Sequence, residues 1–226
     1  MTRIVEPIIQ DLRQKILQMG GLSEEILKKS MRAVFDRDRE VALEVPADDL
    51  EIDRFDISID DAVLRALALQ APVADDLRLV IAIKMMATDL ERVGDLSRNI
   101  AKCAARLADH PEVTIPSKLK DLAFEAQRLL RRALDSFSES DVLRAESVLD
   151  DDDQVDDDQD EVVRQTILEI AQHPEISSQG IDFILIAKNL ERVADHATNI
   201  AEEVILWTDG RNLKHATKLQ DDAPGS

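Results

Sequence analysis

ATDLERVGDLSRNIA, residues 87–101, returns one hundred positions later as AKNLERVADHATNIA, residues 187–201. Nine of the fifteen positions are identical in the two copies. A repeat of this kind indicates two copies of one supersecondary unit. The identical positions include Leu, Val, Ile and Ala, which helix packing requires, and also Glu, Arg, Asp and Asn, which packing alone does not require. Each half of the chain is therefore expected to hold the same helical unit and the same polar pattern.

The shared polar residues lie along one face if the repeat is helical. Glu91, Asp95 and Asn99 are spaced i, i+4 and i+8, about 6 Å apart on successive turns, and residues 191–199 repeat that spacing. Like charges at i, i+4 weaken a helix by a few tenths of a kcal/mol, so local stability does not explain them. A single motif of this kind usually marks a solvated helix face. Because the motif occurs twice, a functional site and a solvated helix face are equally favoured interpretations.

The composition of the chain indicates a globular, all-α protein. Of its 226 residues, 44% are hydrophobic, which is enough for a sizeable core. Aromatic residues make up only 3%, Tyr is absent, and Gly and Pro number six and seven. A core of Leu, Ile, Val, Ala and Met with so few turn residues is typical of long helices.

The charge of the chain restricts its partners. Forty-seven acidic residues against 28 basic ones give a net charge of −19. That balance argues against nucleic acid or an anionic membrane surface, and it suits cations or a protein with a basic patch. The single cysteine, Cys103, falls within a helical pattern, is expected in the core, and excludes a disulfide framework. No stretch has the pattern of a secretory signal or a membrane span, so a cytoplasmic protein without membrane insertion is expected.

Apolar residues recur every three or four positions in six segments, which predicts six principal helices. The expected helices cover residues 7–36, 38–70, 75–107, 119–137, 141–171 and 176–207. Gly20-Gly21 in the first segment predicts a break or a bend. Pro46 in the second predicts a break or a first-turn position.

These six helices fall into two groups of three. The connection 110–116, with two prolines, separates them. We therefore expect two tandem, pseudo-repeated antiparallel three-helix bundles, with the first domain at residues 1–110 and the second at residues 116–208. A polar tail, residues 209–226, is expected to be frayed.

The second expected helix carries its own acidic stripe. Asp49, Asp53, Asp56 and Asp60 lie at i, i+4, i+7 and i+11, which is one face of a helix. An apolar stripe runs beside them. Both the second and the third helices of the first half therefore present carboxylates.

The second half contains a denser acidic tract, DDDDQVDDDQDE at residues 150–161. It lacks the glycine of an EF-hand loop, and a plain charge run of this density is often solvated or disordered. An offset of 103 residues, however, aligns the tract with the first acidic stripe. The alignment predicts a second acidic helix with Asp152, Asp156 and Asp160 as its stripe.

Each half thus offers two carboxylate stripes, and neighbouring helices would let them share a hard cation. Oxygen ligands suit iron, manganese, magnesium or calcium. The expected metal ligands are Asp49, Asp53, Asp56, Asp60, Glu91, Asp95, Asp152, Asp156, Asp160, Glu191 and Asp195. Clustered carboxylates are costly without a cation, partner arginines or open solvent. Arg92 and Arg192 are the local rivals of a metal for that role.

No catalytic constellation is visible in the sequence. The four histidines form neither the Glu-x-x-His pair of ferritin-like di-iron proteins nor a HExxH zinc site. No Ser-His-Asp set, glycine-rich phosphate loop or CxxC is present. His196 replaces Leu96 of the first copy, and a ligand role for it is the less favoured interpretation.

Several of these features together resemble the PhoU family, over residues 7–207. They are Met19-Gly20-Gly21, the lead-in Ala71-Pro72 with Asp76-Leu77-Arg78-Leu79, and the motifs LERVGD and LERVAD at residues 90–95 and 190–195. The resemblance implies two similar three-helix bundles, in agreement with the helix count. The sequence departs from the family pattern at two places. Ala194 of the second copy replaces the glycine found at Gly94, and a dense run of aspartates follows Leu149.

The resemblance also implies a function. PhoU proteins are cytoplasmic negative regulators of the phosphate-starvation response, thought to link the ATPase subunit of the phosphate ABC transporter to a sensor histidine kinase. Their acidic motifs are described as binding metal ions, so a divalent or trivalent metal (iron, manganese, magnesium or zinc) and a homodimer are expected. Gln159 and Val163 stand where Asp56 and Asp60 would fall, so the second metal site is expected to be weaker or differently built.

Three classes of function stay open at this point. The favoured one is a non-enzymatic adaptor whose acidic faces meet a membrane complex, with metals in a structural or modulating role. A di-iron-type carboxylate metalloenzyme is the alternative, weakened by the lack of a shared histidine. The third is a metal-free structural bundle. Direct phosphate binding by Arg92 or Arg192 is less favoured than a salt bridge.

Overall fold

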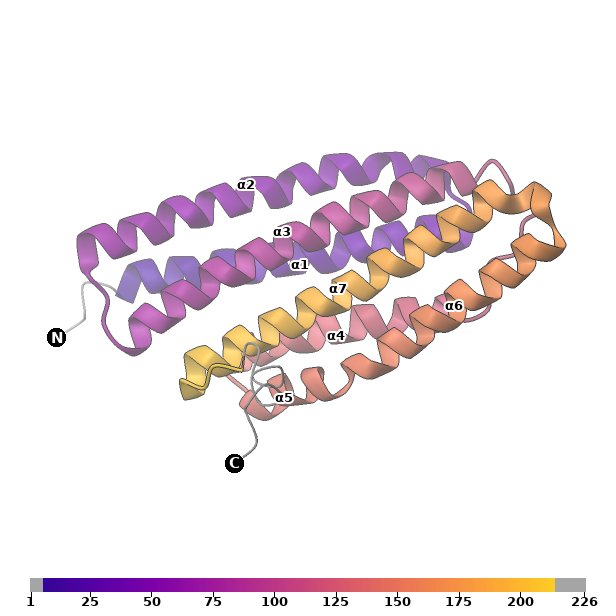
Figure 1. Cartoon of the computed structure of the whole chain (residues 1–226). Helices are drawn as coiled ribbons and strands as arrows, with labels where there is room; N and C mark the ends of the chain where they lie inside the picture. Colours follow the sequence, from indigo (N-terminus) through magenta and orange to yellow (C-terminus); the bar gives the residue numbers. More distant parts are fainter. Residues whose placement is uncertain (1–5, 214–226) are drawn as a thin grey trace, which may run out of the picture.

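The structure, a computed structural model, describes residues 6–213. This part of the chain contains seven α-helices, one 3₁₀-helix and no strand (Figure 1). The elements are α1 (Glu6–Asp36), α2 (Arg39–Gln70), α3 (Asp75–Leu107), α4 (Leu119–Glu139), α5 (Val142–Asp150), α6 (Asp152–Gln172), η1 (Pro174–Ile176) and α7 (Ser177–Asp209). The all-α fold of two tandem three-helix bundles is confirmed. The domain limits stay predictions, and most of the expected tail lies outside the described residues.

The predicted break at Gly20-Gly21 is wrong, since α1 continues through both residues. The reason lies in another helix. Gly20 is buried, and a Cβ atom there would lie 2.7 Å from Cδ2 of Leu134 in α4. The missing side chain therefore lets α4 approach α1, and the packing against α4 outweighs the low helix propensity of glycine.

Pro46 also fails to interrupt its helix, because α2 begins seven residues earlier and runs past it. The side chain of Asp38 caps α2 by accepting a hydrogen bond from the Val41 backbone N–H at 3.0 Å. Burial of Ala42 and Val45 on the inner face holds the helix together where Pro46 cannot donate a backbone hydrogen bond. Tertiary packing thus overrides the local signal.

The fifth expected helix is instead two helices, α5 and α6, joined at Asp151. The Asp151 carboxylate accepts hydrogen bonds from Arg128 at 3.1 Å and from Arg132, both in α4. These charge-assisted bonds tie the junction to α4, a contact that helical periodicity along one segment does not reveal. The acidic tract itself is helical, so its interpretation as a disordered run is wrong and its interpretation as a second acidic helix is confirmed.

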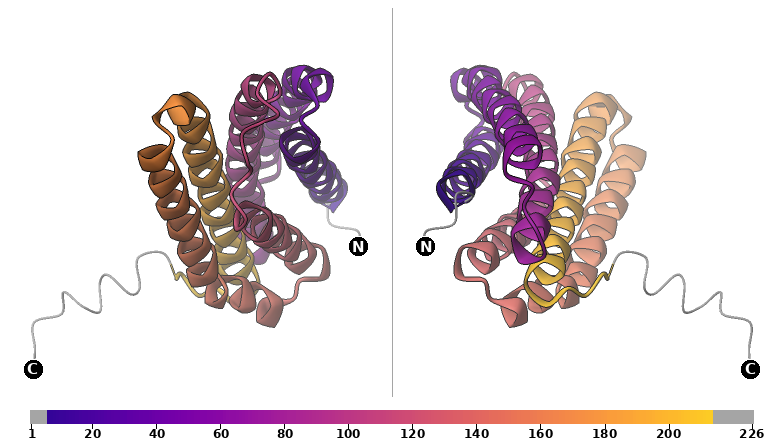
Figure 2. Two further views of the ribbon diagram at one scale, coloured as in Figure 1. Left: turned by 90° about the vertical axis from the view of Figure 1, so that its right-hand side faces the viewer. Right: turned by 90° about the vertical axis from the view of Figure 1, so that its left-hand side faces the viewer.

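The two bundles pack against each other through their third helices, α3 and α7, which share the largest contact in the described chain. Figure 2 shows α6, α7, α3 and α2 in a row, with α1 and α4 on one side of that row. The acidic helices α2 and α6 therefore lie at its outer edges. Each of them contacts the third helix of its own bundle.

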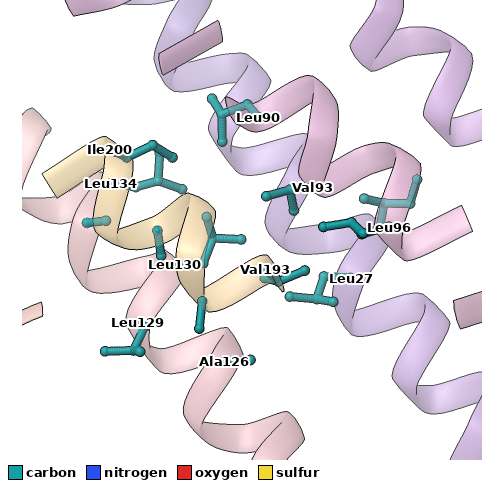
Figure 3. Close-up of a cluster of buried hydrophobic side chains, with 14 of the residues drawn as sticks. Leu27, Leu90, Val93, Leu96, Ala126, Leu129, Leu130, Leu134, Val193 and Ile200 are labelled. Carbon is teal, nitrogen blue, oxygen red and sulfur yellow. The ribbon is translucent and has the colours of Figure 1, made fainter. Parts of the chain in front are cut away.

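The apolar half of the repeat fills the centre of the molecule. The ten apolar residues that the two copies share are all buried: Ala87, Leu90, Val93, Ile100, Ala101, Ala187, Leu190, Val193, Ile200 and Ala201. Figure 3 shows Val93 and Val193 in one cluster of buried side chains with Leu27 of α1 and Leu130 of α4. Full burial of each large aliphatic side chain contributes roughly 1.5–3 kcal/mol. The repeat is thus the core of both bundles and of the contact between them.

Polar contacts also join the halves. The Arg106 Nε–H of α3 donates to the buried Asp182 of α7 at 3.0 and 3.1 Å. Asp89 of α3 lies 2.8 Å from Nδ1 of His196 and accepts a hydrogen bond from Asn199 at 3.2 Å. These pairs have no symmetric counterpart, because Ala82 and Leu206 stand where a second Arg–Asp pair would fall. They fix one relative position of α3 and α7.

Two simpler expectations are also settled. Cys103 is buried, and burial raises the pKa of its thiol to about 11, so it is a core residue that stays protonated near neutral pH. Along residues 6–213, no helix combines the length and apolar composition needed to cross a bilayer.

Candidate functional site

The first carboxylate cluster lies between α2 and α3, as the two stripes predicted. It consists of Asp49, Asp53 and Asp56 on α2 and of Glu91 and Asp95 on α3. Burial raises the pKa of Glu91; Arg92 opposes that shift, and Asp95, Asp53 and Asp56 add to it. The carboxylates of the two helices therefore lie close enough to repel one another.

Arg98 joins the two helices at the buried end of this cluster. Its guanidinium binds Asp49 on α2 and Asp95 on its own helix. Asp49 is 1% exposed, and burial raises its pKa while the charge of Arg98 opposes that rise. Gly94 leaves room for this arrangement, since a Cβ atom there would lie 2.7 Å from Oδ1 of Asp49. Ala194, which departs from the family pattern, is the second-half counterpart of this position.

Two further cations form salt bridges with most of the remaining carboxylates of the first cluster. Arg92 lies 3.2 Å from Asp95 and 3.4 Å from Glu91, so the predicted rival for the counterion role does form salt bridges. Lys84 lies 3.4 Å from Asp56 and also pairs with Asp60. Within residues 6–213, Asp53 is the one predicted ligand on α2 that forms no ion pair. The first cluster therefore carries most of its counterions within the chain.

The second carboxylate cluster lies between α6 and α7 and has a different charge balance. It consists of Asp152 and Asp156 on α6 and of Glu191 and Asp195 on α7. Burial raises the pKa of Asp152 to about 6, and Asp195 and Asp156 add to that shift. Burial followed by Asp195 likewise raises the pKa values of Asp156 and Glu191.

None of these four carboxylates forms an ion pair in the described chain. The positions that supply Arg98 and Lys84 in the first half hold Thr198 and Ile184 in the second. Arg192 acts on Glu191 only at longer range, where it lowers the pKa against the larger effect of burial. The second cluster is therefore an uncompensated group of carboxylates at the molecular surface.

The remaining predicted ligand, Asp160, is exposed on α6. Its charge also raises the pKa of Asp156, but less than burial, Asp195 and Asp153 do. Among residues 6–213, no three His, Cys, Asp or Glu side chains converge closely enough to hold one metal ion. The structure thus brings the predicted residues together in two clusters, and their assignment as metal ligands stays a prediction. His196 forms a hydrogen bond with Asp89 where the two bundles meet.

Sequence reasoning missed the residues that distinguish the clusters. Arg98 lies three positions after Asp95, and Lys84 lies seven before Glu91, so both are on the acidic face of the same helix. That spacing was available as a signal. Comparison of the two copies at positions 84 and 98 would have shown that only the first half carries these cations.

We predict that Gly94→Ala destabilises the protein, because the new methyl group displaces Asp49 from Arg98. Overpacking of this kind costs roughly 1–3 kcal/mol in the free energy of unfolding. Gly21→Ala is the matched control, since nothing lies within 4 Å of its added methyl group. It should stabilise α1 by about 0.5–1 kcal/mol. Urea unfolding measures both, and a Gly94→Ala protein as stable as wild type would contradict the account.

We predict that Asp152→Asn stabilises the protein at pH 7. Above pH 6 the Asp152 carboxylate is ionised in both the folded and the unfolded state. Only in the folded state do burial and the neighbouring aspartates destabilise that charge. With allowance for its partial exposure, the gain is about 1 kcal/mol. As the pH falls from about 6 to 4, the folded protein binds the proton first and the gain disappears.

The matched control for that substitution is Asp153→Asn, an exposed residue in the same first turn of α6. It shares any effect of the helix dipole, and its charge raises the pKa of Asp152 less than burial, Asp195 and Asp156 do, so its substitution relieves only the smaller part of the repulsion. Unfolding in urea at pH 7 and at about pH 4.5 separates the two variants. Loss of stability in Asp152→Asn relative to Asp153→Asn at pH 7 would refute the repulsion.

Comparison with known proteins places this arrangement in one family. The PhoU domain family matches residues 16–104 and 119–204. The phosphate-specific transport system accessory protein PhoU homolog of Pseudomonas aeruginosa is 33% identical over 217 residues, which are 95% of this chain and 90% of the relative. The corresponding homolog of Synechocystis is 34% identical, over 91% of this chain and 92% of the relative.

Solved structures agree with the sequence matches. The crystal structure of PhoU from Pseudomonas aeruginosa superposes with a TM-score of 0.87 at 32% identity, covering 91% of this chain and 99% of that one. The phosphate transport system regulatory protein PhoU from Streptococcus pneumoniae gives 0.85 at 27% identity, covering 92% and 99%. The resemblance seen in the doubled motif is confirmed, and the chain belongs to the PhoU family.

Proposed function

We propose that this protein is a cytoplasmic negative regulator of the phosphate-starvation response and of phosphate uptake. It acts as a non-enzymatic adaptor between the ATPase subunit of the phosphate ABC transporter and a sensor histidine kinase. The observation that carries this proposal is the match, over nine-tenths or more of both chains, to proteins named accessory to phosphate-specific transport. The name of the Streptococcus pneumoniae relative, a regulatory protein, supports the non-enzymatic role.

The distribution of charge supports an adaptor role. Helix α2 carries nine acidic residues against three basic ones, and α6 carries eight against one. Both helices lie at the outer edges of the row of four helices in Figure 2. Exposed acidic edges of this kind attract and orient a partner with a basic surface. They give the protein two similar but unequal faces, one for each bundle.

A deletion strain grown with ample phosphate tests the regulatory role. We predict constitutive expression of phosphate-uptake genes, restored to repression by a plasmid copy of the wild-type chain. Reporter expression in ample and in limiting phosphate measures the effect. Tight repression in the deletion strain would contradict the proposal.

The metal-binding role rests on the second cluster. Its four carboxylates offer only oxygen donors and lack an internal cation, which is the environment a hard ion such as Mn²⁺ or Mg²⁺ prefers. No three of them converge on one point in the described residues, so an ion would have to draw the side chains together. A bound ion would supply the positive charge that Arg98 and Lys84 supply in the first half. We therefore propose Asp152, Asp156, Glu191 and Asp195 as the stronger site, in contrast to the expectation from Gln159 and Val163 alone.

Calorimetric titration with Mn²⁺ tests this order. We predict that Glu191→Gln with Asp195→Asn weakens the tightest binding step by tenfold or more, about 1.4 kcal/mol. Glu91→Gln with Asp95→Asn is the matched control and should change that step by less than about threefold. Equal losses in the two double variants, or the larger loss in the first cluster, would refute the proposed order. In the deletion strain, the Glu191 and Asp195 variant should also repress less completely.

A further inference from the structure

The tripeptide His-Pro-Glu occurs twice in the chain, and both copies lie at the same end of the molecule. Residues 110–112 belong to the connection between the bundles, and residues 173–175 join α6 to α7. Both connections lie at the right-hand end of Figure 1. The two tripeptides are 63 residues apart, whereas the internal repeat has an offset of 100 to 103 residues. The duplication therefore does not account for the pair.

The two tripeptides form the same kind of turn. The Val113 N–H donates to the His110 carbonyl at 3.2 Å, and the Ile176 N–H donates to the His173 carbonyl at 3.1 Å. Proline occupies the second position of each turn, which its fixed φ favours. Nδ1 of each histidine lies 3.3 Å from Oε1 of the glutamate two residues later. Each turn therefore places an imidazole beside a carboxylate.

Both turns line one open cavity of about 500 Å³. Both histidines and both glutamates of the turns contribute to its lining, and so do Glu169 of α6 and Gln179 of α7. None of the three glutamates forms an ion pair with a lysine or an arginine of residues 6–213. The cavity thus combines two imidazoles with three carboxylates that lack a strong internal counterion.

A polar atom at this cavity also lacks a partner. Oε1 of Gln179 is buried and accepts no hydrogen bond within residues 6–213. Buried amide oxygens are nearly always paired, because an unpaired one has lost its hydrogen bonds to water without replacement. A cation in the cavity would supply the missing partner. This observation is independent of the two turns.

The glutamates of the turns leave one nitrogen of each imidazole free to bind a metal. Metal-binding histidines commonly donate their other ring N–H to a carboxylate, which fixes the tautomer and raises the basicity of the ligand nitrogen. Here Nδ1 faces the carboxylate in both turns, and neither Nε2 has a hydrogen-bond partner within the described chain. Nε2 is therefore the coordinating atom. Two imidazole nitrogens with one carboxylate are a donor set typical of Zn²⁺.

We propose that this cavity binds one Zn²⁺ ion through Nε2 of His110, Nε2 of His173 and the carboxylate of Glu169. Oε1 of Gln179 completes a tetrahedral set. No three of the acidic or imidazole groups converge on one point within residues 6–213, so the ion draws the side chains together. The imidazoles are free to move, since the His110 and His173 side chains are 45% and 53% exposed.

This zinc site is separate from both carboxylate clusters and joins the two bundles at one end. His110 and Gln179 also line the neighbouring cavity, which contains the Arg106–Asp182 pair between α3 and α7. A bound ion ties the connection between the bundles to the start of α7 beside that pair. The proposal does not depend on the regulatory function, and zinc binding by the purified protein gives the same answer whether or not that function holds.

Calorimetric titration of the purified full chain with Zn²⁺ tests the site. We predict that His110→Asn and His173→Asn each weaken the binding of one zinc ion per chain by tenfold or more, because each removes a ligand nitrogen. Glu112→Ala should weaken it by about tenfold, as loss of an orienting carboxylate does. Asp109→Asn is the matched control. It precedes His110 but is absent from the lining of the cavity, so it should change the affinity by less than about twofold.

Two further measurements identify the coordinating atoms. In the double variant Glu191→Gln with Asp195→Asn, which disables the second carboxylate cluster, this zinc ion should still bind. In ¹⁵N spectra of the imidazole rings, Zn²⁺ should shift Nε2 of both His110 and His173 while Nδ1 stays protonated. Circular dichroism confirms that the variants fold.

Three results would overturn the proposal. One is zinc affinity unchanged in folded His110→Asn or His173→Asn protein. Another is zinc binding that disappears in the Glu191→Gln and Asp195→Asn variant, since the ion would then occupy the carboxylate cluster. The third is a Zn²⁺ titration that shifts Nε2 of one ring only, or of neither.

Discussion

Carboxylates on adjacent packed helices repel one another, and the two halves of this chain meet that constraint differently. In the first half Arg98 joins the buried Asp49 to Asp95, and Arg92 and Lys84 neutralise their neighbours. In the second half Thr198 and Ile184 replace two of these cations, and burial with mutual repulsion raises the pKa of Asp152 to about 6. One half thus carries its counterions internally, and the four carboxylates of the other have no ion pair within residues 6–213.

The duplication separates what the fold needs from what each half does. Residues identical in both copies and apolar, such as Val93 and Val193, form the core and the contact between the bundles. The differences that separate the two acidic faces lie on α2, α5 and α6 and on the sides of α3 and α7 that face them. Leu50 and Ile57 are exposed on α2, and acidic residues, Asp153 and Asp160, stand at the corresponding positions of α6. The two bundles therefore have similar folds but different surfaces, which agrees with the proposed adaptor role.

Most of the fold could be predicted from the sequence, because the apolar spacing that defines each long helix is local. The repeat also placed the two acidic stripes correctly, since α2 and α6 each contact the third helix of their bundle. Gly20, Pro46 and Asp151 were misread because their conformation depends on helices distant in sequence, such as the close approach of Leu134 to Gly20. The roles of Arg98 and Lys84 were missed for a related reason, as a salt bridge across helices depends on side-chain reach rather than on periodicity.

The central claim is that the cluster between α6 and α7 takes its counterion from solution and that the cluster between α2 and α3 does not need one. Anomalous X-ray scattering from crystals grown with Mn²⁺ tests this most directly, because it locates the ion without reference to function. The account predicts the strongest anomalous peak beside Glu191 and Asp195, with a weaker one or none beside Glu91 and Asp95. A strongest peak beside Glu91 and Asp95, or no peak at either cluster, would contradict it.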